Sequence, residues 1–130
     1  MEPAELMKQF QQAPIPKWMN ADMSFETDGS ATVTLEIRKE HLQATGVAHG
    51  SIITFAADTS AWFTAASASK KLVMTSGFNL DLLRAANEGD TLTAKSSVIK
   101  SGRTLVVVRT TVTCNDGKLI AEGSFTHAVV

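Results

Sequence analysis

The chain has 130 residues, of which 44% are hydrophobic and 19% are charged, and its formal net charge is -1. This length favours a single domain with one core over residues 1–130, and the near-neutral charge lacks the basic excess typical of nucleic-acid-binding proteins. The single cysteine, Cys114, excludes an internal disulfide and favours a reducing compartment such as the cytoplasm.

Residues 1–20 are expected to form an N-terminal helix and a loop. The sequence Pro3–Gln12 predicts a short helix, which we expect to stop at Pro14 and Pro16 because proline cannot donate a backbone hydrogen bond. The first ten residues, MEPAELMKQF, lack the basic start and apolar core of a secretory signal.

Two strands are predicted next, at Met23–Thr27 and Ala31–Arg38, on either side of the turn signal Asp28-Gly29. In the second strand, Val, Leu and Ile alternate with Thr and Glu, which indicates one buried face. His41–Ala48 is expected to be a loop.

A long helix is predicted from Gly50 to about Ser69, and it is apolar nearly all round. Its Thr, Ser and Asp residues, and the strand-like segments that follow, favour a buried helix of a soluble domain over a membrane span. Such a helix must be covered on several sides, either by a sheet that curls around it or by a second copy of the chain.

The rest of the chain reads as four strands separated by turns that recur every 12 to 15 residues, which predicts an antiparallel meander. The strands are expected at Leu72–Leu83, Thr91–Lys100, Arg103–Cys114 and Lys118–Val130. The predicted fold class is therefore α+β, with one long helix against five or six antiparallel strands.

Asp58 is the only charged residue between Ser51 and Ser69. Burial disfavours the charged form of a carboxylate, so an acid in an apolar helix lowers stability and indicates a functional role. The alternative is a structural carboxylate that is paired across an interface.

The start of the long helix, at His49-Gly50, offers backbone N–H groups that could bind a negative charge or a polarised carbonyl. Asp58 lies eight residues further on, which is about 12 Å along the helix axis and roughly 80° around it. The two groups therefore cannot reach one reacting carbon within one chain. They could do so if two chains packed antiparallel and each site drew on both.

The segment QATGVAHG, residues 43–50, followed by Asp58, resembles the signature of hotdog-fold acyl-CoA thioesterases of the phenylacetate-pathway (PaaI-like) group. The resemblance covers roughly residues 20–130. Two positions depart from the family pattern: Ser51 replaces the second glycine of the usual pair, and Leu83-Arg84-Ala85 replaces Leu-Arg-Pro.

The resemblance implies a hotdog fold, dimers with a continuous sheet, often paired into tetramers, and hydrolysis of an acyl-CoA to a carboxylic acid and CoA. It implies that the Gly50 N–H polarises the thioester carbonyl and that Asp58 is a general base or a nucleophile. It also implies that Gln43 holds the loop or the catalytic water, and that Thr75 or Ser76 orients water near the acid. CoA enters as part of the substrate, and no further cofactor is implied.

Several residues have a structural alternative. His49 is expected to shape the loop rather than to act as an acid or base, and Ser51 to tighten the helix start or to cap it. Trp62 is either core or part of the acyl pocket. Strand-end cations are candidates for binding the CoA phosphates, or else ordinary surface charges: Arg84, Lys100, Arg103 and Lys118. No spacing of His, Cys and Asp suggests a metal site, and no G-x-S-x-G predicts a serine nucleophile.

Two other functions stay open from sequence. One is a non-catalytic acyl-CoA-binding or acyl-ligand-binding hotdog protein, although such proteins often lack the helix acid. The other is a hydratase or dehydratase of acyl thioesters, whose usual His–acid motif is not found. The acyl group, and the choice between CoA and an acyl carrier protein, are not determined by the sequence.

Overall fold

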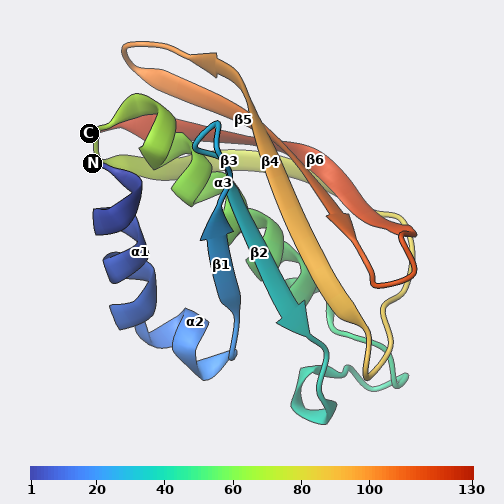
Figure 1. Ribbon diagram of the computed structural model, residues 1–130. Coiled ribbons are helices and arrows are strands. Elements are labelled where there is room, and N and C mark those ends of the chain that lie inside the picture. Colours follow the sequence, from blue (N-terminus) through green and yellow to red (C-terminus); the bar gives the residue numbers. More distant parts are fainter.

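The long helix α3, Gly50–Ser69, lies against one face of a six-stranded antiparallel sheet that curls around it (Figure 1). The coordinates are a computed structural model that describes residues 1–130. The bounds of α3 are those predicted, and the helix ends at Lys70, whose φ of 58° puts the backbone in the left-handed region that terminates helices. The predicted α+β architecture is confirmed.

The six strands are arranged in the order β1-β2-β4-β5-β6-β3. Their bounds are β1 Asp22–Phe25, β2 Ala31–Glu36, β3 Val73–Leu82, β4 Thr91–Ser101, β5 Leu105–Thr113 and β6 Leu119–Val129. The prediction that the four later strands form a continuous meander is wrong, because of these four only β4, β5 and β6 follow one another in space. Helix α3 carries the chain from β2 across the sheet, so β3 pairs with β6 at the far edge and β4 takes the place beside β2.

The N-terminal region differs from the prediction in one respect. Helix α1, Pro3–Gln12, ends as expected, but a second short helix, α2, Pro14–Trp18, starts directly afterwards. Proline is well accommodated in the first turn of a helix, so Pro14 begins α2. Further along, a short 3-10 helix, η1, Lys39–His41, ends at the first residue of the segment expected to be a loop.

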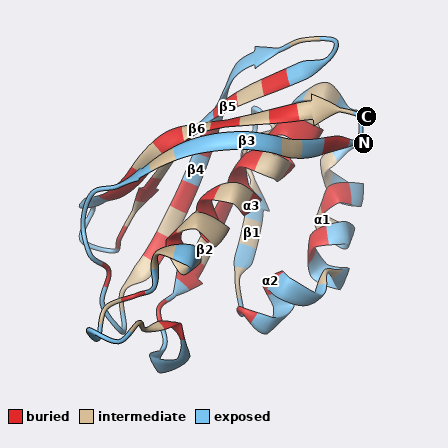
Figure 2. Cartoon of the chain, turned by 180° about the vertical axis from the view of Figure 1, so that it is seen from behind, coloured by how far each residue is buried: buried red, intermediate tan, exposed pale blue.

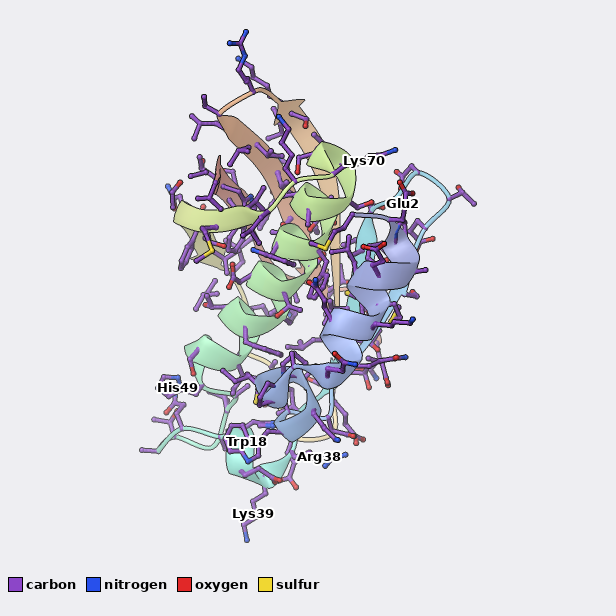
Figure 3. All side chains as sticks on the ribbon, turned by 90° about the vertical axis from the view of Figure 1, so that its left-hand side faces the viewer. Glu2, Trp18, Arg38, Lys39, His49 and Lys70 are labelled. Atoms are coloured by element: carbon purple, nitrogen blue, oxygen red, sulfur yellow. The ribbon has the colours of Figure 1, made fainter.

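Helix α1 covers a side of α3 that the sheet leaves open (Figure 3). Phe10 of α1 is buried and meets Phe63 of α3 edge to face, with ring centroids 5.8 Å apart. At the other end of α1, Glu2 forms an exposed ion pair at 3.4 Å with Lys70, the residue that ends α3 (Figure 3). Hydrophobic packing, rather than this solvated pair, therefore holds α1 on α3.

Strand β3 is the least covered strand of the sheet and appears mostly exposed in Figure 2. One of its two edges has no partner strand in this chain. Large apolar side chains along it are open to solvent: Met74 is 56% exposed, Phe78 53% and Leu82 49%. A long edge strand with exposed apolar side chains is a ready surface for pairing with another chain.

Helix α3 is the longest helix, and no helix of the protein combines the length and apolar character that crossing a membrane requires.

Candidate active site

The first turn of α3 is capped by a histidine. The Nδ1 atom of His49 accepts the backbone N–H of Ser51 at 3.1 Å and lies 2.8 Å from the Ser51 hydroxyl. The idea that Ser51 supplies a hydroxyl N-cap is therefore wrong, because the cap is the His49 imidazole. Since Nδ1 accepts a backbone N–H, its lone pair is occupied, which supports the loop-shaping reading of His49.

The backbone N–H of Gly50, the first residue of α3, has no acceptor in this chain. Gly50 borders a cavity of about 320 Å³ that is lined by Gln43, Ala48, Gly50, Ile53, Leu82, Leu83, Arg84 and Ala85. A Cβ atom at Gly50 would lie 3.0 Å from Cδ1 of Leu82, so glycine allows β3 to approach the helix start closely. The cavity thus combines a free N–H donor with an apolar wall.

Gln43 lines the same cavity and also holds the loop. Its Oε1 atom accepts hydrogen bonds from the N–H and the hydroxyl of Thr45, both at 2.8 Å. This fixes the side-chain carbonyl and leaves the amide Nε2, which only donates, without a partner in this chain. Gln43 can therefore stabilise the loop and offer a donor to a molecule in the cavity.

Asp58 lies half-buried on α3 and accepts a hydrogen bond from the hydroxyl of Thr75 on β3, with an Oγ1–Oδ1 distance of 3.1 Å. Burial raises the pKa of Asp58 above its ordinary value, while the Thr75 hydrogen bond and a positive charge on His127 act in the opposite direction. A carboxylate with a raised pKa is a stronger base near neutral pH.

The sequence left Thr75 and Ser76 as alternatives beside the acid, and the structure separates them. Strand β3 has a bulge between Thr75 and Gly77, where two of its residues face one of β6. Thr75 precedes the bulge and points toward α3, whereas the Ser76 hydroxyl donates to the carbonyl of Thr126 and is exposed. Only Thr75 contacts Asp58.

Gly50 and Asp58 both lie along the β3 side of the helix, but at different points. Leu82, near the end of β3, approaches Gly50, and Thr75, near its beginning, contacts Asp58. Eight helical residues separate the two groups by about 12 Å. One chain therefore presents the two groups on one edge of the molecule, but too far apart to act on a single carbon atom.

Trp62 lies one turn after Asp58 and anchors the helix to the sheet. Its indole N–H donates to the carbonyl of Val73 at 2.8 Å, and its ring meets Phe63 edge to face at 4.8 Å. These contacts support a packing role, although the side chain is only half-buried.

The candidate cations are not gathered in one place. Arg84 lines the cavity at the helix start. Lys100 and Arg103 lie at the β4–β5 turn, which projects at the other end of the sheet in Figure 1. Lys118 forms an exposed ion pair with Asp116 at 3.6 Å. In a single chain, Arg84 alone of the four lines this cavity.

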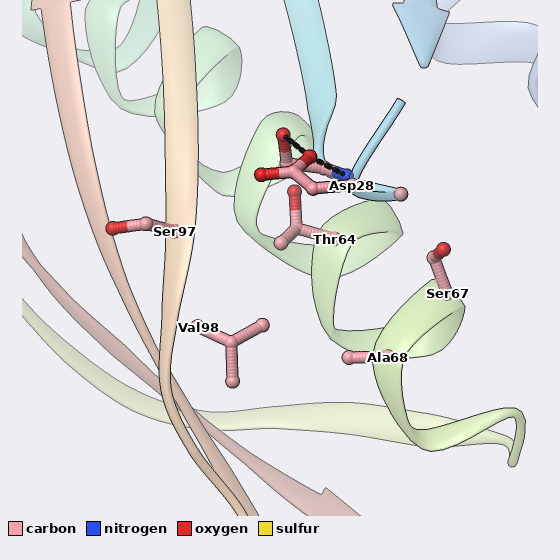
Figure 4. Close-up of a pocket in the computed structure, with 8 residues that line it drawn as sticks. Asp28, Thr64, Ser67, Ala68, Ser97 and Val98 are labelled. Carbon is pink, nitrogen blue, oxygen red and sulfur yellow. Dashed lines mark hydrogen bonds between the residues drawn. The ribbon is translucent and has the colours of Figure 1, made fainter. Parts of the chain in front are cut away.

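A separate cavity of about 300 Å³ lies between the β1–β2 turn, the later half of α3 and β4 (Figure 4). Its one charged residue, Asp28, accepts hydrogen bonds from the N–H and hydroxyl of Ser30, which lower the pKa of Asp28. The carboxylate therefore stabilises its own turn, and none of the sequence candidates lines this cavity. Nowhere does the structure group three His, Cys, Asp or Glu side chains that could hold a metal ion.

His127 was not among the candidate residues taken from the sequence. It is fully buried on β6, and its Nε2 atom has no hydrogen-bond partner. The buried His41 is satisfied instead, because its Nδ1 accepts the Arg38 N–H at 2.9 Å. The alternation of Phe125, His127 and Val129 along one strand face was the available signal for an inward-pointing histidine.

Comparison with known proteins decides the family, because residues 45–121 match the family model described as Thioesterase superfamily. The chain belongs to the thioesterase superfamily. Its fold is the hotdog fold of these thioesterases, with a TM-score of 0.92 to the PaaI protein of the Escherichia coli phenylacetic acid degradation operon, at 22% identity over 98% of this chain and 91% of that one.

Two other similar structures contain CoA compounds. A Streptococcus mutans protein bound to acetyl CoA is 32% identical, with a TM-score of 0.79 over 85% of this chain and 89% of that one. A hypothetical thioesterase from Streptococcus pneumoniae with coenzyme A is 26% identical, with a TM-score of 0.85 over 95% and 96%. An esterase candidate from Archaeoglobus fulgidus is 33% identical over 94 residues, or 72% of this chain and 60% of that protein.

Proposed function

We propose that this thioesterase-superfamily protein hydrolyses an acyl-CoA thioester to a free carboxylic acid and CoA. The observation that carries the proposal is the pairing of two half-sites on one edge: a half-buried Asp58 oriented by Thr75, and an unpaired Gly50 N–H beside a cavity. The CoA compounds bound to two relatives support CoA as the acyl carrier.

In the proposed reaction, the thioester oxygen accepts a hydrogen bond from the Gly50 N–H, which stabilises the negative charge that develops on it. Asp58 takes a proton from water as the water oxygen bonds to the carbonyl carbon. The carbon–sulfur bond then breaks, and the leaving thiolate takes the proton from Asp58. The second route, in which Asp58 attacks the carbonyl and water cleaves the resulting anhydride, uses the same groups.

We propose that each site is shared between two copies that pair through β3. An antiparallel pairing centred on Asn79 would set Leu82 of one copy opposite the β3 bulge of the other, directly beside Thr75. Gly50 adjoins Leu82 and Asp58 adjoins Thr75, so this pairing would join complementary half-sites. The exposed apolar side chains and the open edge of β3 support this assembly, and pairs of such dimers would form the tetramer expected from the family resemblance.

The proposal also covers the extent of the domain, the binding of the CoA phosphates and the compartment. We propose that residues 1–130 act as one thioesterase domain and that Arg84, from beside the helix start, binds a CoA phosphate. Lys100 and Arg103 would have to come from another copy to join it. The buried Cys114, which forms no disulfide, fits a reducing compartment such as the cytoplasm.

The deciding experiment measures thiol release from short, medium, long and aromatic acyl-CoAs, with Asp58→Asn as the control. Turnover that requires Asp58 supports the proposal. Tight acyl-CoA binding without turnover over the whole panel would instead favour a non-catalytic binding protein. Water addition to an enoyl-CoA without thiol release would favour a hydratase.

Removing the Thr75 hydroxyl is expected to shift the pH dependence of the reaction. Its hydrogen bond favours ionised Asp58, so Thr75→Val should raise the pKa of Asp58 further and move the acidic limb of kcat/KM to higher pH. The rate on the plateau should fall about tenfold as the carboxylate loses its orientation. The matched control is Ser76→Ala, which removes a hydroxyl one residue away. Equal profiles for the two variants would remove Thr75 from the site.

A further inference from the structure

The Nε2 atom of His127, on β6, has no hydrogen-bond partner. It is the one buried side-chain nitrogen or oxygen atom in the protein of which this is true. The side chain has no exposed surface. A buried polar atom without a partner lowers stability by about 1–3 kcal/mol. Such an atom calls for an explanation, and its neighbours supply one.

The placement of His127 connects it to Asp58. In the sheet, Thr75 of β3 and Val106 of β5 are the cross-strand neighbours of His127. Cross-strand neighbours project from the same face, and Thr75 already reaches Asp58 from that face. The three side chains Asp58, Thr75 and His127 are thus consecutive neighbours.

The orientation of the ring fixes its proton. The Nδ1 atom of His127 lies 3.4 Å from the carbonyl oxygen of Val106, which only accepts hydrogen bonds, so Nδ1 carries the hydrogen of the neutral ring. Nε2 is then a bare acceptor. Because Nδ1 is turned toward β5, the opposite edge of the ring faces the β3 side, where Thr75 lies.

No other charge competes at this position. Asp58 is the only charged residue of α3, and burial lowers the pKa of His127, which keeps the imidazole neutral near pH 7. On the strands around them, Arg109 and Glu122 form an ion pair with each other at 3.9 Å, and about half of each side chain is exposed to solvent. The remaining charged residues of the elements packed on the helix are exposed: Glu2, Glu5, Lys8, Glu36, Asp81, Lys95 and Lys100.

We propose that His127 is a positioning residue that acts on Asp58 through Thr75, its Nε2 accepting the Thr75 hydroxyl whenever Asp58 holds a proton. With Asp58 ionised, the Thr75 hydroxyl donates to Asp58, as in the structure. Once Asp58 takes the proton from water, its O–H donates to Thr75 Oγ1, and the Thr75 hydrogen turns to Nε2. No O–H or N–H bond of Thr75 or His127 breaks, and the proton stays on Asp58 until the thiolate takes it.

This arrangement stabilises the protonated form of Asp58, so it raises the pKa of that carboxyl and strengthens it as a base. The role of His127 in catalysis rests on the proposed thioesterase function, whereas its effect on the pKa of Asp58 does not depend on that function. An imidazolium at position 127 would have the opposite effect, because a positive charge lowers the pKa of Asp58.

The test compares His127→Asn with His127→Gln. The amide of Asn can replace Nδ1 toward Val106 but has nothing at the place of Nε2, whereas the longer Gln can put an acceptor there. We expect His127→Asn to lower the pKa of Asp58 by about half to one unit. This pKa is measured by ¹³C NMR of the Asp58 carboxyl carbon as a function of pH. The acidic limb of kcat/KM should move to lower pH by the same amount, and His127→Gln should restore both.

An unchanged or higher Asp58 pKa in His127→Asn, with normal folding by near-UV circular dichroism, would overturn the proposal. Should that variant not fold, the ¹⁵N shift of His127 Nε2 in the unmodified protein decides. As pH falls, this chemical shift should change with the same midpoint as the protonation of Asp58, because the hydrogen bond to Nε2 forms when Asp58 takes a proton. A chemical shift that does not change at that midpoint would refute the proposed role of His127. A protein that cleaves no acyl thioester would refute the proposed function, and both NMR measurements would still decide the role of His127.

Discussion

Replacing Asp58 with asparagine is expected to lower kcat for acyl-CoA hydrolysis by about a thousandfold or more, without loss of the fold. The amide has nearly the same shape, and its oxygen can still accept the Thr75 hydrogen bond. It can neither take a proton from water nor form an anhydride, so both proposed routes fail. The measurement is thiol release from the best acyl-CoA substrate, under saturating conditions.

The same variant should be more stable than the parent at neutral pH. The pKa of Asp58 is raised in the folded protein, so the ionised form is disfavoured by folding. Stability is therefore fully present below the unfolded pKa and decreases as pH rises through the folded pKa. Asp58→Asn should show little stability difference in acid and a gain above that range, measured by thermal unfolding from pH 3 to 8.

The exposed Asp81 on β3 provides the control, since Asp81→Asn removes a carboxylate outside the proposed site and should retain activity. Full activity in Asp58→Ala would refute the assignment of Asp58 as base or nucleophile. Activity that is lost together with the helical circular dichroism signal would instead show a structural role.

The second large effect is expected at the helix start. Gly50→Pro removes the backbone N–H, and proline fits the first position of a helix, so α3 should still form. Loss of one oxyanion donor should lower kcat by roughly a hundred- to a thousandfold. Gly50→Ala keeps the N–H and adds only a Cβ near the flexible Leu82 side chain, so it should lose far less.

Mixing the two inactive variants tests whether the site is shared. If each site takes Gly50 from one copy and Asp58 from the other, a mixed dimer of Asp58→Asn and Gly50→Pro chains has one intact site and one doubly defective site. A refolded equimolar mixture should then recover about a quarter of the parental activity, because about half of the dimers are mixed. No recovery, with mixed dimers shown by mass spectrometry, would place the whole site within one chain.

Local patterns predicted the elements well. The bounds of α3 and the presence of six strands followed from apolar periodicity and turn residues, which act over a few positions. The strand order could not be obtained in this way. The pairing of β3 with β6 depends on the edge of the sheet to which α3 carries the chain, and local patterns do not contain that information. The α2 helix was missed because Pro14 and Pro16 were taken only as helix breakers.

The site shows the same division. Asp58 and Gly50 could be proposed as candidates from their types and spacing, since a lone acid in an apolar helix and a glycine at its start are visible in the sequence. The choice of Thr75 over Ser76 depends on the β3 bulge. The His49 cap and the orphaned His127 nitrogen depend on side-chain geometry, which no local pattern contains.

The far-edge position of β3 also bears on how the chain folds. Thr75 is aligned against His127, so it is held in place by a strand that lies later in the chain than two others, β4 and β5. Until β6 has been synthesised and has joined the sheet, β3 has no partner strand, and contacts between distant segments form slowly. The Thr75–Asp58 contact should therefore be among the last to form, and a nascent chain that stalls before β6 would expose an apolar strand prone to aggregation.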